Sequence, residues 1–258
     1  MGDIQGVALG LTAALAWGLT DTIATFASRR VGSLRATAGT QLTSVAVLAV
    51  LLLASGTALP SHPAVVLTAL ACGAVAAVAY IAFFTALRHG PITVVSPVVA
   101  TYGGLTVVLS VVLLGEAPAP AQALGVAMAT TGVVLASVVF DRGLRSARPV
   151  GPGVAYAVVA LVAFAGLTVA LAGPIRTAGW LPVLLLARTA NAGSVWLILG
   201  ATRLRRPPAP ASAEGRPIDR RALGLAIAAG LLDIAGFIAF ALGLEIAPTW
   251  LIGITSSF

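Results

Sequence analysis

Three ionisable residues, Asp21, Arg188 and Asp233, lie within long apolar segments of this sequence of 258 residues. On insertion scales an Asp or Arg at the centre of a bilayer-spanning helix costs about 2.5–3.5 kcal/mol, so each is expected to have a role. Asp233 lies at the centre of its segment, with no other charged residue within ten positions. We therefore take Asp233 as the first candidate for binding a substrate or an ion, with Asp21 as a second acid.

Two functional hypotheses follow for Asp233, and the sequence leaves both open. As a lone buried acid, it would exchange protons and couple transport to a proton gradient. If Arg188 lies opposite, the two would instead form a fixed ion pair that selects zwitterionic solutes. Each residue also has a structural alternative. Asp233 could hydrogen-bond to another helix, Asp21 could reach water or Arg29 and Arg30, and Arg188 could extend to the membrane interface.

Aromatic and amide side chains accompany these charges at helical spacing. Residues three or four positions apart share a helix face, and Trp17, Asn191 and Phe237 stand in this relation to the three charged residues. We expect them to line a solute site together with two tyrosines of neighbouring segments, although aromatic residues inside a bundle are often only packed. The expected substrate- or ion-binding residues are Asp233, Asp21, Trp17, Tyr80, Tyr102, Arg188, Asn191 and Phe237.

The elements that carry these residues are apolar enough to be membrane spans. The chain is 59% hydrophobic and 9% charged, whereas an ordinary soluble domain has about 25% charged residues. A helix needs ~20 apolar residues to cross a bilayer, which predicts an all-α integral membrane protein. Pro91 and Pro97 are expected to break or kink the start of the fourth span. The predicted spans are residues 4–27, 35–55, 63–87, 91–114, 119–140, 151–173, 181–201 and 222–244, with part of a ninth from 247 to 258.

The charge pattern predicts an orientation and a class of partner. All 15 positively charged residues are Arg, and 13 of them lie in the connections after spans one, three, five and seven. The positive-inside rule makes these connections cytoplasmic and places the N-terminus outside. The formal charge of +7 is therefore that of a bilayer protein, and no nucleic-acid partner is expected. The expected partners are the lipid bilayer, a small-molecule substrate and protons.

Two pairs of similar segments indicate an internal repeat. Residues 16–20 (Ala-Trp-Gly-Leu-Thr) are echoed by residues 164–168 (Phe-Ala-Gly-Leu-Thr), and residues 83–87 (Phe-Phe-Thr-Ala-Leu) by residues 238–242 (Ile-Ala-Phe-Ala-Leu). A unit of five spans must invert when it is repeated, and the basic connections switch accordingly. We therefore predict two inverted five-helix repeats, residues 1–145 and 146–258, with the second incomplete.

Several motifs give the chain a resemblance to a known family. They are Ala-Ala-Leu-Ala-Trp-Gly at 13–18, Ala-Leu-Arg-His-Gly-Pro at 86–91 with Ser-Pro at 96–97, and Leu-Leu-Gly-Glu at 113–116 followed by Gln122, Gly125 and Gly132. The sequence resembles EamA-type members of the drug/metabolite transporter superfamily, whose fold is two inverted five-helix repeats. A second Gly-Glu…Gln…Gly segment would follow residue 258, so the resemblance implies a C-terminally truncated member, which we expect to self-associate.

The expected function is secondary transport across a cell membrane, with a bacterial-type plasma membrane as the expected location. The resemblance implies export of metabolites, amino-acid-like compounds or drugs. A gradient of an ion or of the substrate would drive it, because no Gly-x-x-x-x-Gly-Lys nucleotide motif is present. No enzymatic activity, cofactor or metal is expected, since one Cys and two His form no ligand cluster. The alternatives are a membrane-embedded enzyme and a lipid or lipid-linked sugar translocase.

Overall fold

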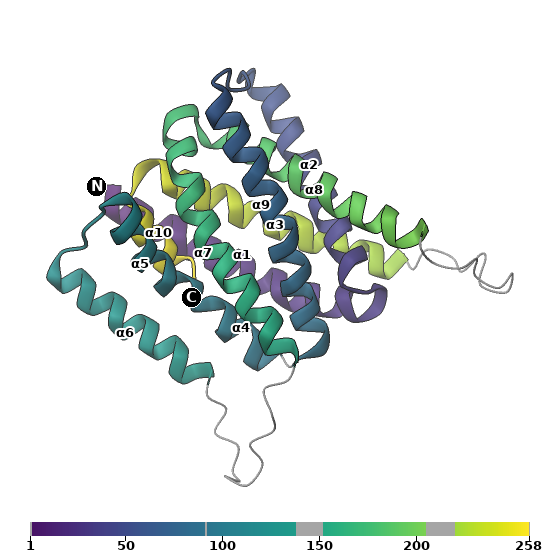
Figure 1. Ribbon diagram of the computed structural model, residues 1–258, viewed down its shortest axis with the longest axis horizontal. Coiled ribbons are helices and arrows are strands. Elements are labelled where there is room, and N and C mark those ends of the chain that lie inside the picture. Colours follow the sequence, from purple (N-terminus) through teal and green to yellow (C-terminus); the bar gives the residue numbers. More distant parts are fainter. Residues whose placement is uncertain (1, 91, 138–151, 205–219, 258) are drawn as a thin grey trace, which may run out of the picture.

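The structure is a computed structural model that describes residues 2–90, 92–137, 152–204 and 220–257, and its regular elements in these ranges are all helices. The predicted division between halves, at residues 141–150, lies outside the described residues. Figure 1 shows the helices packed side by side in one bundle. They are α1 (Gly2–Val31), α2 (Ser33–Ser55), α3 (Pro63–His89), α4 (Ile92–Ala100), α5 (Tyr102–Leu114), α6 (Pro120–Ser137), α7 (Pro152–Ala178), α8 (Trp180–Leu204), α9 (Arg220–Ile246) and α10 (Thr249–Thr255).

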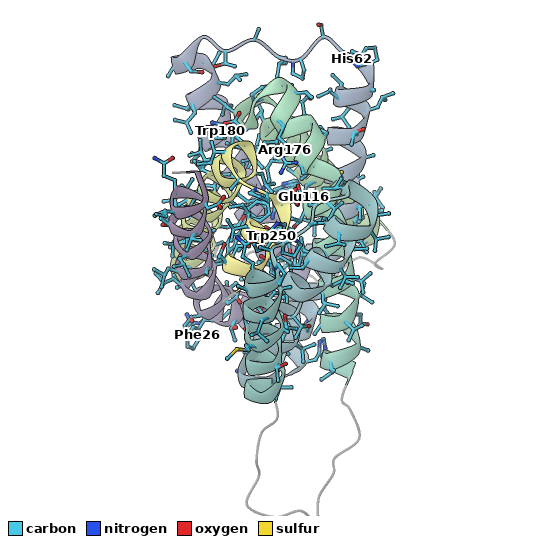
Figure 2. All side chains as sticks on the ribbon, turned by 90° about the vertical axis from the view of Figure 1, so that its left-hand side faces the viewer. Phe26, His62, Glu116, Arg176, Trp180 and Trp250 are labelled. Atoms are coloured by element: carbon cyan, nitrogen blue, oxygen red, sulfur yellow. The ribbon has the colours of Figure 1, made fainter. Side chains whose placement is uncertain are left out.

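The predicted all-α membrane fold is confirmed. In the described chain seven segments are long and apolar enough to cross a membrane: α1, α2, α3, α4 joined with α5, α7, α8 and α9. The predicted fifth span corresponds to α6, and the predicted partial ninth begins with α10. Large apolar side chains such as Phe26, Leu53 and Leu197 remain exposed, as expected where lipid replaces water as the solvent. Figure 2 shows Phe26 on the outside of the bundle.

The fourth span is interrupted, but not at Pro97, and the other expected position, Pro91, lies outside the described residues. Pro97 lies inside α4, and the break between α4 and α5 occurs at Thr101. There the N–H and the hydroxyl of Thr101 both donate to the carbonyl oxygen of Val98, at 3.3 and 2.7 Å. A bond to the third preceding residue tightens the turn and interrupts the α-helical pattern. The expected break is therefore present, and its position differs by four residues from Pro97.

The two halves of the chain are packed into one another. The most extensive helix contacts join α1 to α9 and α3 to α7, and further contacts join α2 and α3 to α8. At the α3–α8 crossing, a Cβ on Gly73 would collide with the backbone carbonyl of Ala187. A glycine there lets the two backbones approach closely, as is common between membrane helices.

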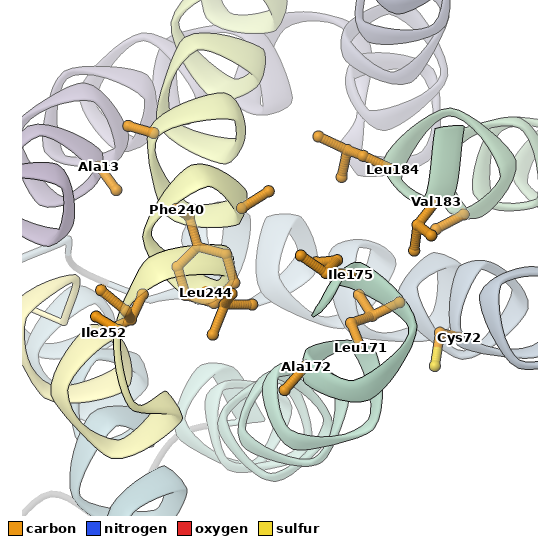
Figure 3. Close-up of a cluster of buried hydrophobic side chains, with 14 of the residues drawn as sticks. Ala13, Cys72, Leu171, Ala172, Ile175, Val183, Leu184, Phe240, Leu244 and Ile252 are labelled. Atoms are coloured by element: carbon orange, nitrogen blue, oxygen red, sulfur yellow. The ribbon is translucent and has the colours of Figure 1, made fainter. Parts of the chain in front are cut away.

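One apolar cluster joins the two halves at the centre of this packing. Its buried members come from α1, α2, α3, α5, α7, α8, α9 and α10, and Figure 3 shows part of the cluster. Because the cluster draws on both halves, its burial depends on their association. The labelled members are Ala13, Cys72, Leu171, Ala172, Ile175, Val183, Leu184, Phe240, Leu244 and Ile252.

Three connections meet at one end of the bundle around Glu116, which follows α5. Arg176 at the end of α7 forms a 3.0 Å ion pair with Glu116 and also donates to the carbonyl oxygens of Leu244 and Ala247. The other oxygen of Glu116 accepts the N–H of Trp250 in the first turn of α10, at 3.1 Å. Figure 2 shows Glu116, Arg176 and Trp250 close together. Glu116 thus connects the first half of the chain to the second.

These contacts also shift the pKa of Glu116. Burial alone would raise the pKa of Glu116, but the hydrogen bonds from Thr249, Trp250 and Arg176 outweigh it and lower the pKa below its usual value. A lowered pKa means that the folded protein favours the ionised carboxylate. The carboxylate therefore stabilises the start of α10, where backbone N–H groups would otherwise lack acceptors.

Candidate substrate-binding site

A cavity of about 560 Å³ lies within the helix bundle. Its walls are formed by α1, α3, α4, α5, α7, α8, α9 and the C-terminal side of α10. Its size is suited to a small organic molecule, and few polar groups interrupt its apolar and aromatic walls. All eight residues expected from the sequence to bind a substrate or an ion line this cavity: Trp17, Asp21, Tyr80, Tyr102, Arg188, Asn191, Asp233 and Phe237.

A buried ion pair crosses the cavity wall from α8 to α9. Arg188 Nη2 lies 3.1 Å from Asp233 Oδ2, and the two side chains are 3% and 4% exposed. The other carboxylate oxygen, Asp233 Oδ1, accepts a 2.8 Å hydrogen bond from the hydroxyl of Tyr80. Ser44 on α2 donates to Asp233 Oδ2 at 3.5 Å. The structure therefore pairs Arg188 with Asp233.

The guanidinium of Arg188 is held by three further groups. Nη1 donates to Gln41 Oε1 on α2 at 2.7 Å, and Nη2 donates to the hydroxyl oxygen of Tyr80 at 3.1 Å. The guanidinium carbon lies 3.7 Å from the ring centroid of Phe237. An Arg guanidinium can donate several hydrogen bonds in its own plane while that plane stacks on an aromatic ring. A Lys ammonium cannot do both. Buried ions require such additional partners, because desolvation offsets much of their attraction.

Trp17 connects α1 to the same region of α9. Its indole N–H donates to the backbone carbonyl of Asp233 at 3.4 Å, and its ring centroid lies 4.8 Å from Phe237 and 5.4 Å from Phe240. This approach requires Gly236, because a Cβ there would lie 2.6 Å from Trp17 Nε1. The tryptophan therefore forms an aromatic wall beside the ion pair.

Asp21 lies at a different part of the cavity wall from the ion pair. Among the described residues, the hydrogen bond to its carboxylate comes from the hydroxyl of Ser96 on α4, at 3.3 Å. The structure thus places Asp21 against α4 and the cavity instead of with Arg29 or Arg30. The two acids differ in setting, because Asp233 is paired with a cation and Asp21 is bonded to a neutral hydroxyl.

The remaining candidates complete the walls. The hydroxyls of Tyr102 and Ser256 are 2.7 Å apart, which joins α5 to the end of α10. Asn191 Nδ2 donates to Gln41 Oε1 at 3.2 Å, one helical turn after Arg188. The ring of Phe164 on α7 lies edge-on to Tyr80, with centroids 5.5 Å apart.

Sequence reasoning missed several residues of this site. They are Gln41, Ser44, Ser96, Phe164 and Ser256. Gln41 could have been recognised from the sequence, because an amide inside an apolar span needs a hydrogen-bond partner. The three serines carry no such signal, because a serine in a helix can bond to its own backbone. In the described chain, no group of three or more His, Cys, Asp or Glu is arranged to hold a metal ion.

Apolar helices around a solute-sized cavity with a buried ion pair in its wall define a multi-pass membrane protein with an internal cavity. The model of the EamA-like transporter family matches residues 4–138, more than half of the chain. The chain therefore belongs to the EamA-like transporter family and is a membrane transporter of small molecules.

A comparison with solved structures supports the same fold. The crystal structure of a protein 23% identical to this chain matches with a TM-score of 0.72, covering 98% of this chain and 83% of that one. At this identity the match shows a shared fold alone. No curated protein matches the sequence.

Proposed function

We propose that this protein is a secondary transporter of small zwitterionic solutes that carry an apolar or aromatic group, and that the 560 Å³ cavity is its binding site. The observation that carries the proposal is the Arg188–Asp233 pair in the cavity wall. A zwitterion presents one charge to each partner, and aromatic rings attract both the apolar part and the ammonium group of such a solute. Export out of a bacterial-type cell is the direction that the family resemblance favours.

The helix packing supports a repeat of two inverted halves. If α1, α2, α3 and the pair α4–α5 are copied as α7, α8, α9 and α10, then the contact of α1 with α9 has its counterpart in that of α3 with α7. The contact of α2 with α9 likewise matches that of α3 with α8. We propose that residues 1–145 and 146–258 are these halves, and that the cavity between them alternates between the two sides of the membrane.

For coupling, we propose Asp21 as the acid that exchanges protons or meets the substrate's ammonium group. Asp233 is engaged by Arg188, Tyr80 and Ser44, which favours the hypothesis that it belongs to a fixed ion pair. Asp21 carries a charge in the cavity whose described hydrogen bond is to a neutral group. A gradient of the substrate itself is the alternative driving force.

Counterflow in vesicles tests the proposal. The purified full chain, reconstituted in phosphatidylcholine vesicles loaded with L-phenylalanine, should accumulate radiolabelled phenylalanine by exchange. Asp233→Asn keeps the size of the side chain but leaves Arg188 uncompensated, so it should weaken binding itself. If the wild-type chain exchanges no zwitterion but moves fluorescent phospholipids between leaflets, the proposal is wrong and a lipid translocase replaces it.

A further inference from the structure

Two buried amides beside the ion pair each leave one atom without a hydrogen-bond partner. Gln41 on α2 is 0% exposed and Asn191 on α8 is 1% exposed. Among the described residues, neither Gln41 Nε2 nor Asn191 Oδ1 has a partner, and less than 1 Å² of each atom is accessible. A buried polar group without a partner is destabilising, so this arrangement needs an explanation.

The orientations of both amides follow from chemistry. Gln41 Oε1 accepts from Arg188 Nη1 at 2.7 Å, and a flipped Gln41 amide would place its NH₂ against the guanidinium, which has no acceptor. Asn191 Nδ2 donates to the same oxygen at 3.2 Å. A flipped Asn191 amide would place its own carbonyl oxygen against that of Gln41, and two acceptors cannot form a hydrogen bond. The unpaired donor and the unpaired acceptor therefore result from Gln41 turning its carbonyl towards Arg188.

The two amides could pair with each other twice if Arg188 were not there. Neighbouring amides form a reciprocal pair when each donates to the other, and here only the bond from Asn191 to Gln41 is made. The second bond, from Gln41 Nε2 to Asn191 Oδ1, becomes available when the Gln41 amide turns away from Arg188. The two atoms left over in the present state are the ones that this bond would join.

We propose that Gln41 and Asn191 are positioning residues that make Arg188 available to a carboxylate of the substrate. With the cavity empty, Gln41 holds the guanidinium beside Asp233. When a substrate carboxylate draws Arg188 into the cavity, Gln41 and Asn191 pair reciprocally and compensate for the lost bond. The inference rests on the proposed function, because it assigns the substrate an anionic group that Arg188 meets.

Two matched probes separate the carboxylate from the rest of the solute. L-phenylalanine and L-phenylalaninamide share the ring and the ammonium group, and only the first has a carboxylate. Asn191→Leu leaves the bonds of Arg188 to Gln41, Tyr80 and Asp233 in place. It removes the bond that Asn191 donates to Gln41 Oε1 and the acceptor that Gln41 Nε2 needs after release. We expect it to weaken phenylalanine binding on the order of tenfold and to leave phenylalaninamide binding unchanged.

A second variant and a control complete the binding measurements, made by calorimetry on the full chain in detergent. Gln41→Glu gives Arg188 a second carboxylate and removes the donor, so it should also weaken only phenylalanine binding. Thr40→Val is the control, because it removes a buried hydroxyl beside Gln41 that bonds within its own helix. In the wild type, the ¹⁵N resonance of the Gln41 side-chain amide should shift on adding phenylalanine but not phenylalaninamide.

The outcomes distinguish the inference from the proposed function. If wild-type protein binds phenylalanine and Asn191→Leu weakens both probes equally, the amides are structural and the inference is wrong. An unchanged affinity for both probes would overturn it as well. If the wild type binds neither probe, the proposed function fails and the inference fails with it.

Discussion

Arg188 and Phe237 are stacked, with the guanidinium carbon 3.7 Å from the centre of the ring. Phe237 follows Asp233 by one turn of α9, so a single helix presents both the counter-ion and the aromatic face to the same guanidinium. The arrangement fixes the plane of the cation as well as its position. A solute in the proposed site would therefore meet an oriented set of donors at this wall.

Arg188→Lys should destabilise the protein although it preserves the charge. A Lys ammonium has no planar fork, so the acceptor Gln41 Oε1 loses its bond from Arg188. Gln41 Oε1 then keeps only its bond from Asn191, and the loss of a hydrogen bond from a charged group costs about 1.5–3 kcal/mol. We expect the apparent melting temperature of the purified chain in detergent to fall by several degrees. A melting temperature equal to that of the wild type would show that charge alone is required at this position.

Asp21→Asn should remove the pH dependence of transport. The variant keeps size and hydrogen bonding to Ser96 but removes the ionisable group. In vesicles, we expect a pH gradient to stop driving accumulation, whereas exchange at equal pH continues. Ser96→Ala is the matched control, since it removes the hydroxyl and keeps the acid. Proton-driven accumulation that survives in Asp21→Asn would assign coupling to another group.

Glu116→Gln should make stability less sensitive to acid. The pKa of Glu116 is lowered in the folded protein by Thr249, Trp250 and Arg176. The stabilisation is therefore fully present above the pKa of an unperturbed Glu, about 4.3, and is lost as the pH falls through the lowered pKa of the folded state.

Thermal unfolding of both chains at pH 7 and at pH 3 measures this difference. The wild type should be the more stable at pH 7, and the gap should narrow at pH 3, because below the pKa of an unperturbed Glu the unfolded chain gains a proton that favours unfolding. Other acids titrate in both chains, so the comparison isolates Glu116. A gap that is the same at both pH values would contradict the assignment.

Gly236→Ala should disturb the aromatic wall. An added Cβ would lie 2.6 Å from Trp17 Nε1, so the indole must move away from the Asp233 carbonyl. We expect a lower melting temperature and a shift in tryptophan emission. Gly224→Ala on the same helix has no neighbour within 4 Å of its added Cβ, so it should be neutral or slightly stabilising. Equal behaviour of the two variants would mean that Trp17 relaxes without consequence.

Cysteine labelling tests the orientation predicted from the arginines. With the native Cys72 replaced by Ala, a membrane-impermeant maleimide should label Ser61→Cys from outside intact cells. Thr202→Cys, at the end of α8, should react only after the membrane is permeabilised. Both positions are exposed. Labelling of Thr202→Cys in intact cells would invert the topology.

The positions of the helices could be predicted from the sequence because apolar length decides them. Asp21, Arg188 and Asp233 were also identifiable, since a charge inside an apolar span must have a reason. The partner of each charge could not be predicted, because it depends on which helices are neighbours and how each is rotated. The sequence likewise placed a break or kink at the start of the fourth span, at Pro91 and Pro97, whereas the observed break lies at Thr101, whose N–H and hydroxyl both bond to Val98.

The packing of the two halves into one another also determines when each buried charge meets its partner as the chain is inserted into the membrane. Helices enter the membrane in the order of synthesis, so Arg188 arrives 45 residues before Asp233. Gln41 and Tyr80 are already inserted by then and can hold the guanidinium while α9 is still being made. Insertion of α9 then brings Asp233 to Arg188 and closes the packing of α1. In this order of insertion, polar groups beside the cavity give Arg188 hydrogen-bond partners before its counter-ion Asp233 enters the bilayer.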